Sequence, residues 1–229
     1  MSARDPGDWQ AFTVDRMIRI QAALVGRQSA RIVKEIDDHC ESPIEKMLAA
    51  TFASPDHLPQ PWRSVLDFGG SSSTTLDDLV GWFHDALQDG LRSPLYGGLE
   101  GTWTAMIRPQ VEIGPYRMDF ALVAAALSHE AKDPETIPLL KIAIECDGHD
   151  FHERTKEQAA HDRARDRFLQ GEGLTVLRFT GSEIWRSAEA CRNEIIAHVK
   201  RWAEPIVRRF DQEFLARPLK VRTQGDANV

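Results

Sequence analysis

The segment 139–148 constrains the fold most, because it reads as an apolar strand that ends in acidic residues. Alternate side chains of an extended strand point to opposite faces. One face therefore carries Leu140, Ile142, Ile144 and Cys146, and the other carries Lys141, Ala143, Glu145 and Asp147. The sequence thus predicts a core strand with two carboxylates on one face at its end.

The segments around this strand predict a mixed sheet. Residues 102–112 and 116–124 read as two strands that Gly114 and Pro115 separate, which is typical of a hairpin. Downstream, we expect a charged helix over 154–170, a short apolar strand over 174–179 and a helix over 183–210 with a break near Pro205. This order predicts an α/β fold, a mixed β-sheet flanked by helices.

Helices are expected before the strands. An amphipathic helix is predicted over 9–38, and a second helix begins where Ser42, Pro43 and Glu45 form a capping-box pattern. The loop-rich stretch near 57–101 contains one more helical pattern, over 76–87. The predicted organisation is an N-terminal helical extension over 1–40, an α/β core over 41–187 that carries this insertion, and a C-terminal helix with a polar tail over 188–229.

Composition and charge exclude several classes of protein. No apolar run among the 229 residues approaches the ~18 that a membrane span requires, and residues 1–9 lack the apolar core of a secretory signal. Three cysteines without CxxC spacing predict a reducing compartment, the cytoplasm. The net charge is −7, but the C-terminal third is net positive, so a local basic face for nucleic acid stays open.

The two carboxylates on one strand face require an explanation. Two negative charges at such a short distance are unfavourable unless a cation lies between them or one carboxylate is protonated. A divalent cation with oxygen ligands, Mg²⁺ above all, satisfies this requirement. Asp119, the only acid between Arg117 and Leu122, reaches Glu145 if the two strands pair. In the alternative interpretation, Glu145 and Asp147 mark a solvated strand end and Asp119 pairs with an arginine.

A second kind of metal site is also compatible with the spacing. Cys146, His149, His152 and His161 contain the compact pattern Cys-x-x-His-x-x-His of a zinc site. Cys146, however, is expected on the core face of its strand, opposite Glu145. The histidines are equally well explained as ordinary polar residues of a loop and a helix.

Several of these residues occur in an order that resembles a known family. Asp119 lies on the strand after the hairpin turn, and Glu145 stands in the string Ile-Glu-Cys-Asp-Gly. The residues that complete the pattern are Asp162, Arg165, Asp166, Gly173, Arg178 and Phe179. The set resembles the PD-(D/E)XK nuclease superfamily, and within it the branch of very-short-patch repair and related restriction-endonuclease-like proteins. The resemblance covers roughly 42–185 and implies a Mg²⁺-dependent endonuclease, with Mn²⁺ as an alternative ion and DNA as the substrate.

The resemblance also implies roles for individual residues. Asp119 and Glu145 would be the catalytic metal carboxylates, and Glu45 would reach the metal from its helix. Gln110, on the first hairpin strand, would orient a water or a phosphate. Arg165, Arg178 and Lys156 would contact nucleic acid, although Arg178 is equally explained as a paired structural arginine.

One position departs from the family pattern. The superfamily usually has a lysine two residues after the glutamate, and this chain has Asp147 there. Asp147 would add a metal ligand, while His149, His152 or Lys156 would take over proton transfer or charge stabilisation. The departure leaves two alternatives to an active nuclease: a nuclease-fold module that binds nucleic acid without cleaving it, or a structural zinc or interaction protein.

Overall fold

The computed structural model describes residues 14, 16–17, 29–53, 64–66, 74–92, 103–127, 137–148 and 156–215. Six strands of this part of the chain form one sheet with the order β1-β3-β4-β5-β6, and β2 pairs with β3 outside that path. Pairing is antiparallel for β3–β4 and β4–β5 and parallel for the other neighbours. The elements are α2 (Ser29–His39), α3 (Pro43–Phe52), β1 (Ser64–Leu66), β2 (Thr74–Thr75), α4 (Leu76–Arg92), β3 (Trp103–Ile113), β4 (Tyr116–Ala126), β5 (Leu139–Asp147), α5 (Lys156–Gly171), β6 (Leu174–Thr180) and α6 (Gly181–Leu215).

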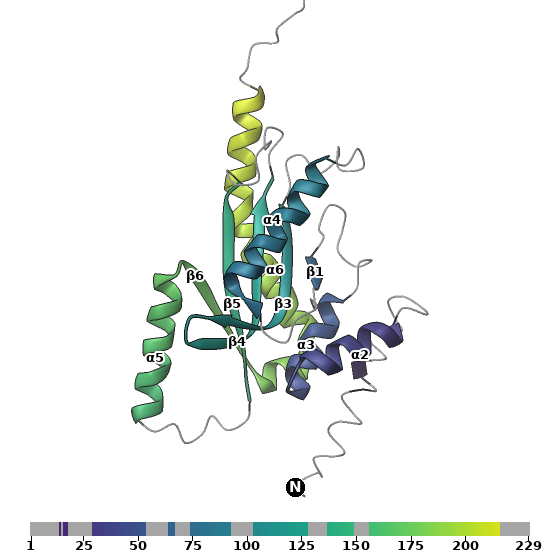
Figure 1. Ribbon diagram of the computed structural model, residues 1–229, viewed down its shortest axis with the longest axis vertical. Helices are drawn as coiled ribbons and strands as arrows, with labels where there is room; N and C mark the ends of the chain where they lie inside the picture. The colour runs from purple at the N-terminus through teal and green to yellow at the C-terminus, as the bar shows by residue number, and fades with distance from the viewer. Residues whose placement is uncertain are drawn as a thin grey trace, which may run out of the picture.

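Helices cover both faces of the sheet (Figure 1). On one face, α2, α3 and α6 pack against one apolar cluster, to which the sheet contributes residues such as Leu122 and Ile142. On the other face, α4 and α5 pack against a second cluster, which includes Val123 and Ala143. The prediction of an α/β mixed sheet flanked by helices is confirmed, and it is consistent with a restriction-endonuclease-like fold.

The central strand β4 explains why both faces need a cover. Every residue from Phe120 to Ala126 is buried, and successive side chains alternate between the two clusters. The same alternation holds in β5, where Ile142, Ile144 and Cys146 lie in the first cluster and Ala143 lies in the second. The predicted faces of the strand over 139–147 are therefore confirmed.

The hairpin of β3 and β4 bends at Gln110, a non-glycine residue with a φ of 54°. Pro109 pairs with Phe120, and Val111 pairs with Met118, so Gln110 lies opposite Asp119. Residues two apart in a regular strand point to the same face, but Phe120 belongs to the first cluster and Met118 to the second. The strands therefore twist sharply between these two pairs. The tip of the hairpin consequently curls toward α5 (Figure 1).

The hairpin tip packs closely on α5. Gly114 has a φ of 58°, and a Cβ there would lie 2.4 Å from the ring of Phe168, so this position needs glycine. The rings of Tyr116 and Phe168 meet edge to face with centroids 5.5 Å apart. These contacts fix the bend that starts beside Asp119.

Two helix boundaries test the sequence interpretation. The capping box that begins α3 is confirmed, because the Glu45 amide donates to Ser42 Oγ and the Ser42 amide donates to Glu45 Oε1. The predicted break near Pro205 is wrong, since α6 continues through this residue. The interruption lies at Ser187 (φ −160°, ψ 95°), whose Oγ accepts from the Ala190 amide as a helix N-cap does.

Other differences concern the edges of the fold. Sequence reasoning missed the short strands β1 and β2. Of the helix predicted over 9–38, only residues 14, 16, 17 and 29–38 lie within the described part of the chain. In this region, α2 packs against the first apolar cluster through Ile36. Cys40, Cys146 and Cys191 are all buried and free. Within the described ranges, no helix is both long and apolar enough to cross a membrane.

Candidate active site

A row of polar residues crosses four neighbouring strands near the ends of β5 and β6. Gln110 on β3 lies opposite Asp119 on β4. The β4–β5 register, which pairs Phe120 with Ile144, places Asp119 beside Glu145. Glu145 in turn pairs with Arg178 of β6. The expected convergence of Asp119 on Glu145 thus follows from the register of the sheet.

The Asp119 carboxylate is fixed by a backbone group of the neighbouring strand. Pairing of β4 with β5 ends at Phe120 and Ile144, and the Cys146 amide donates instead to Asp119 Oδ2 at 2.6 Å. Burial raises the pKa of Asp119 to about 6, against the effect of this hydrogen bond. The negative charges of Glu45 and Asp147 raise this pKa further, so these two carboxylates lie within electrostatic range.

Glu145 is the second carboxylate of the site whose pKa is raised. Its side chain is almost fully enclosed, with the residue 6% exposed, and burial raises its pKa to about 7. Arg165 Nη1 of α5 lies 3.5 Å from Glu145 Oε1 and opposes that rise. This oxygen is nevertheless buried and accepts no hydrogen bond. Glu145 therefore carries a charge that its protein neighbours compensate only in part.

Glu45 reaches the same region from the first turn of α3. The residue is 5% exposed, and Oε2 accepts hydrogen bonds from Gln110 Nε2 at 2.8 Å and from the Glu41 amide at 3.0 Å. The unusual backbone of Gln110 lies at the bend of the hairpin. Gln110 thus holds Glu45, whereas the resemblance implied a water or a phosphate as its partner.

Two arginines border the carboxylates from α5 and β6. Arg178 Nη2 donates to Asp166 Oδ1 of α5 at 2.5 Å, so Arg178 is a paired arginine. Nε of Arg165 and Nε of Arg178 are both buried and donate no hydrogen bond. The two guanidinium groups therefore carry unused donors beside Glu145.

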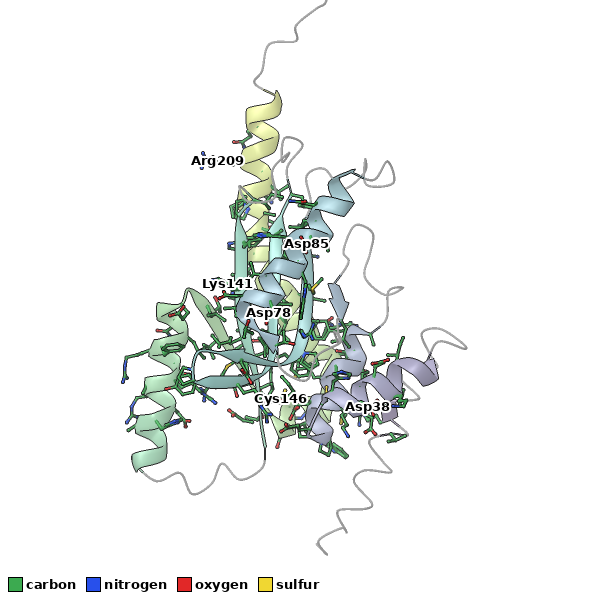
Figure 2. All side chains as sticks on the ribbon, viewed as in Figure 1. Asp38, Asp78, Asp85, Lys141, Cys146 and Arg209 are labelled. Carbon is green, nitrogen blue, oxygen red and sulfur yellow. The ribbon has the colours of Figure 1, made fainter. Side chains whose placement is uncertain are left out.

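Asp147 ends β5, opposite Thr180 of β6, and is partly exposed. Its negative charge raises the pKa of both Asp119 and Glu145. Figure 2 shows the neighbouring Cys146 at the lower end of the sheet, between α5 and α3. Asp147 thus belongs to the same carboxylate group as Asp119, Glu145 and Glu45.

Three residues named from the sequence cannot be placed. His149 and His152 lie outside the described residues, and Lys156 begins α5 with a side chain that is not described. Of the other proposed zinc ligands, Cys146 is buried in the first apolar cluster and His161 packs edge to face on Tyr116. Within the described ranges, no three His, Cys, Asp or Glu side chains form a ready metal site.

Sequence reasoning missed two supports of this site. The first is the ion pair of Arg178 with Asp166. The sequence indicates Asp166 only as a match to the family helix and names no partner for Arg178. The Cys146 amide was not considered as a donor to Asp119. This contact depends on the register between β4 and β5, which the predicted hairpin of β3 and β4 does not fix.

A comparison with known families bears on the same region. Residues 101–199 match a family model described as REase_MTES_1575, which is restriction-endonuclease-like. This stretch of the chain resembles restriction-endonuclease-like proteins. The similarity suggests a nuclease-type function, and it supports that family and not the very-short-patch repair branch specifically. No significant match was found among curated proteins or solved structures.

The restriction-endonuclease-like stretch contains most of the site. Gln110, Asp119, Glu145, Arg165 and Arg178 all lie within residues 101–199. Glu45 is the exception, since it comes from a helix that precedes the matched stretch. The N-terminal helices therefore contribute to the same polar group as the matched core.

Proposed function

We propose that this protein is a Mg²⁺-dependent endonuclease that hydrolyses phosphodiester bonds in DNA. The observation that carries the proposal is the pair Asp119 and Glu145, which lie side by side in the sheet and whose pKa values are raised by burial. Ionisation of two neighbouring buried carboxylates is unfavourable, and a divalent cation between them compensates this cost. The similarity to restriction-endonuclease-like proteins supports the same function.

The donor set fits a hard cation. Asp119 and Glu145 would hold Mg²⁺ or Mn²⁺, and Glu45 and Asp147 would add negative charge or a ligand. Mg²⁺ commonly binds one or two carboxylates together with substrate phosphates and water, so two protein ligands are sufficient. The Oε1 atom of Glu145, which accepts no hydrogen bond, is an oxygen suited to such a ligand.

The bound cation would polarise the scissile phosphate and lower the pKa of the attacking water. The protein residues prepare the site for this ion. The Arg165 guanidinium favours the ionised form of Glu145, and the Cys146 amide orients the Asp119 carboxylate. Gln110 holds Glu45 in place through its side-chain amide.

Arg165 and Arg178 would bind the phosphate group of DNA. A guanidinium donates in several directions, so an arginine that pairs with a carboxylate keeps donors for a phosphate. Asp166 would fix the position of Arg178 for this role. For proton transfer the candidates are Asp147, His149, His152 and Lys156.

The test is cleavage of supercoiled plasmid with Mg²⁺ or Mn²⁺, and with EDTA. We expect relaxed or linear products only with metal, and no cleavage by Asp119→Asn or Glu145→Gln. Glu112→Gln is a matched control, since Glu112 is an exposed carboxylate on β3. Wild-type rates in either site variant, or DNA binding without cleavage under every metal condition, would contradict the proposal.

A further inference from the structure

A pocket of about 610 Å³ lies where β5 and β6 end. Its walls are mainly apolar, and its volume is within the range typical of small-molecule sites. The lining residues come from the start of α3, the end of β5 and the start of α6: Ser42, Pro43, Ile44, Gly148, Gly181, Ser182, Trp185 and Arg186.

The pocket is continuous with the candidate active site along the chain. Gly148 follows Asp147 directly, and Ile44 precedes Glu45. Asp147 pairs with Thr180, which Gly181 follows. A Cβ placed on Gly181 would lie 3.4 Å from the Asp147 carbonyl oxygen. The amide of Ser42, a lining residue, donates to Glu45 Oε1 at 3.2 Å, so the pocket borders the Glu45 carboxylate.

The chemistry of the pocket combines an aromatic ring with positive charge. Two of the lining residues are Trp185, whose side chain is an indole, and Arg186, whose side chain is a guanidinium. Arg16 brings a second guanidinium to 5.9 Å from the centre of the Trp185 ring. Nucleotides present the matching combination, a flat base that stacks on aromatic rings and an anionic phosphate.

We infer that this pocket holds an unpaired base of the nucleic acid, stacked on Trp185, next to the phosphodiester bond that is cleaved. The inference rests on the proposed nuclease function and names its substrate class. A base inside a duplex is stacked between its neighbours and enters a pocket only after it leaves the helix. The preferred substrates are therefore single strands and duplexes with unpaired nucleotides.

The experiment compares three 12-nucleotide probes by fluorescence anisotropy, with Ca²⁺ in place of Mg²⁺. The probes are oligothymidylate, an abasic strand with the same phosphates, and a fully paired duplex. We expect the wild type to bind oligothymidylate about tenfold more tightly than the abasic strand, which is within the range of one stacked base. The duplex should bind more weakly than the single strand.

Variants separate the pocket from the rest of the surface. Trp185→Ala should remove the preference for bases, and Trp185→Phe should keep most of it. Ser182→Phe, which fills the pocket and keeps the indole, should act like Trp185→Ala if both variants melt as the wild type does. Trp82→Ala is the control, because Trp82 is also an accessible indole stacked on an arginine, but lies on α4.

The outcomes distinguish this inference from the proposed function. Plasmid cleavage that needs metal, together with equal binding of the thymidylate and abasic strands, would overturn the inference and leave the nuclease in place. The inference would also be overturned if folded Trp185→Ala preferred oligothymidylate over the abasic strand as strongly as the wild type does. Absence of both cleavage and binding would overturn the inference together with the proposed function.

Discussion

Within β4 and β5, the stretches 120–126 and 142–144 are buried and apolar, whereas Asp119 and Glu145, one residue beyond them, carry partly compensated charges. Both regions belong to the same two strands, and neighbouring positions therefore have opposite effects on stability. In the apolar region, burial is favourable for every side chain. In the polar region, burial is unfavourable for the ionised form of the carboxylates.

This difference shows what the fold supplies to the site. The apolar parts of β4 and β5 are held by helices on both faces, so the register between the strands is fixed. That register keeps Asp119 and Glu145 together even though their charges repel. A rigid core therefore maintains an arrangement that is unfavourable without a cation.

The largest expected effect comes from the apolar region. Phe120 is fully buried, so Phe120→Ala should lower the free energy of unfolding by about 3–5 kcal/mol, through lost burial and the cavity that remains. Chemical denaturation at pH 8 measures this loss. If Phe120→Ala does not fold, Phe120→Leu should fold with a smaller loss. A loss below about 1 kcal/mol for Phe120→Ala would contradict the assignment of this residue to the core.

The adjacent carboxylate region should respond in the opposite direction. Glu145→Gln should raise the free energy of unfolding at pH 8 by up to about 3 kcal/mol without metal, because the pKa of Glu145 is raised to about 7. Below about pH 4.5 the carboxyl group is protonated in the folded and the unfolded state, so Glu145→Gln should not be more stable than the wild type there. The gain should develop between about pH 4.5 and pH 7, where the carboxyl group is ionised in the unfolded state but still protonated in the folded state.

Denaturation curves across this pH range, with EDTA, test the sign. Glu112→Gln, in which an exposed carboxylate is replaced, should differ from the wild type by less than about 0.5 kcal/mol at every pH. A Glu145→Gln variant that is less stable than the wild type at pH 8 would show that Arg165 compensates Glu145 fully.

A smaller effect should come from Asp147, at the edge of the polar region. Asp147→Asn should raise the Mg²⁺ concentration needed for half-maximal cleavage by about tenfold, the lower end of the range for groups that support a metal site. Plasmid cleavage across a Mg²⁺ series measures this change. Full activity with an unchanged Mg²⁺ requirement would make Asp147 a bystander and leave His149, His152 or Lys156 as the base.

The two regions also differ in how well the sequence predicts them. Alternation along 139–147 gave the correct faces of β5, and the Ser42 and Glu45 pattern gave the start of α3. Both features are local, since they depend on residues close in the sequence. The order of strands and helices over 102–180 then sufficed to predict the mixed sheet.

The features that the sequence did not reveal are not local. Gln110 bonds to Glu45, 65 residues away, and this contact depends on the bend of the hairpin. The break in α6 is an exception, since it lies at Ser187, whose contact with the Ala190 amide is local, and not at Pro205. The pocket at Trp185 is formed by three elements and requires their packing to be known.

We propose that a divalent cation compensates the charges of Asp119 and Glu145. The most direct test is the free energy of unfolding at pH 8 as a function of Mg²⁺ concentration. We predict that the wild type and Glu112→Gln gain stability with Mg²⁺, by about 1.4 kcal/mol at ten times the dissociation constant. Asp119→Asn and Glu145→Gln should gain much less. Equal gains in all four proteins, or no gain in the wild type, would contradict the claim.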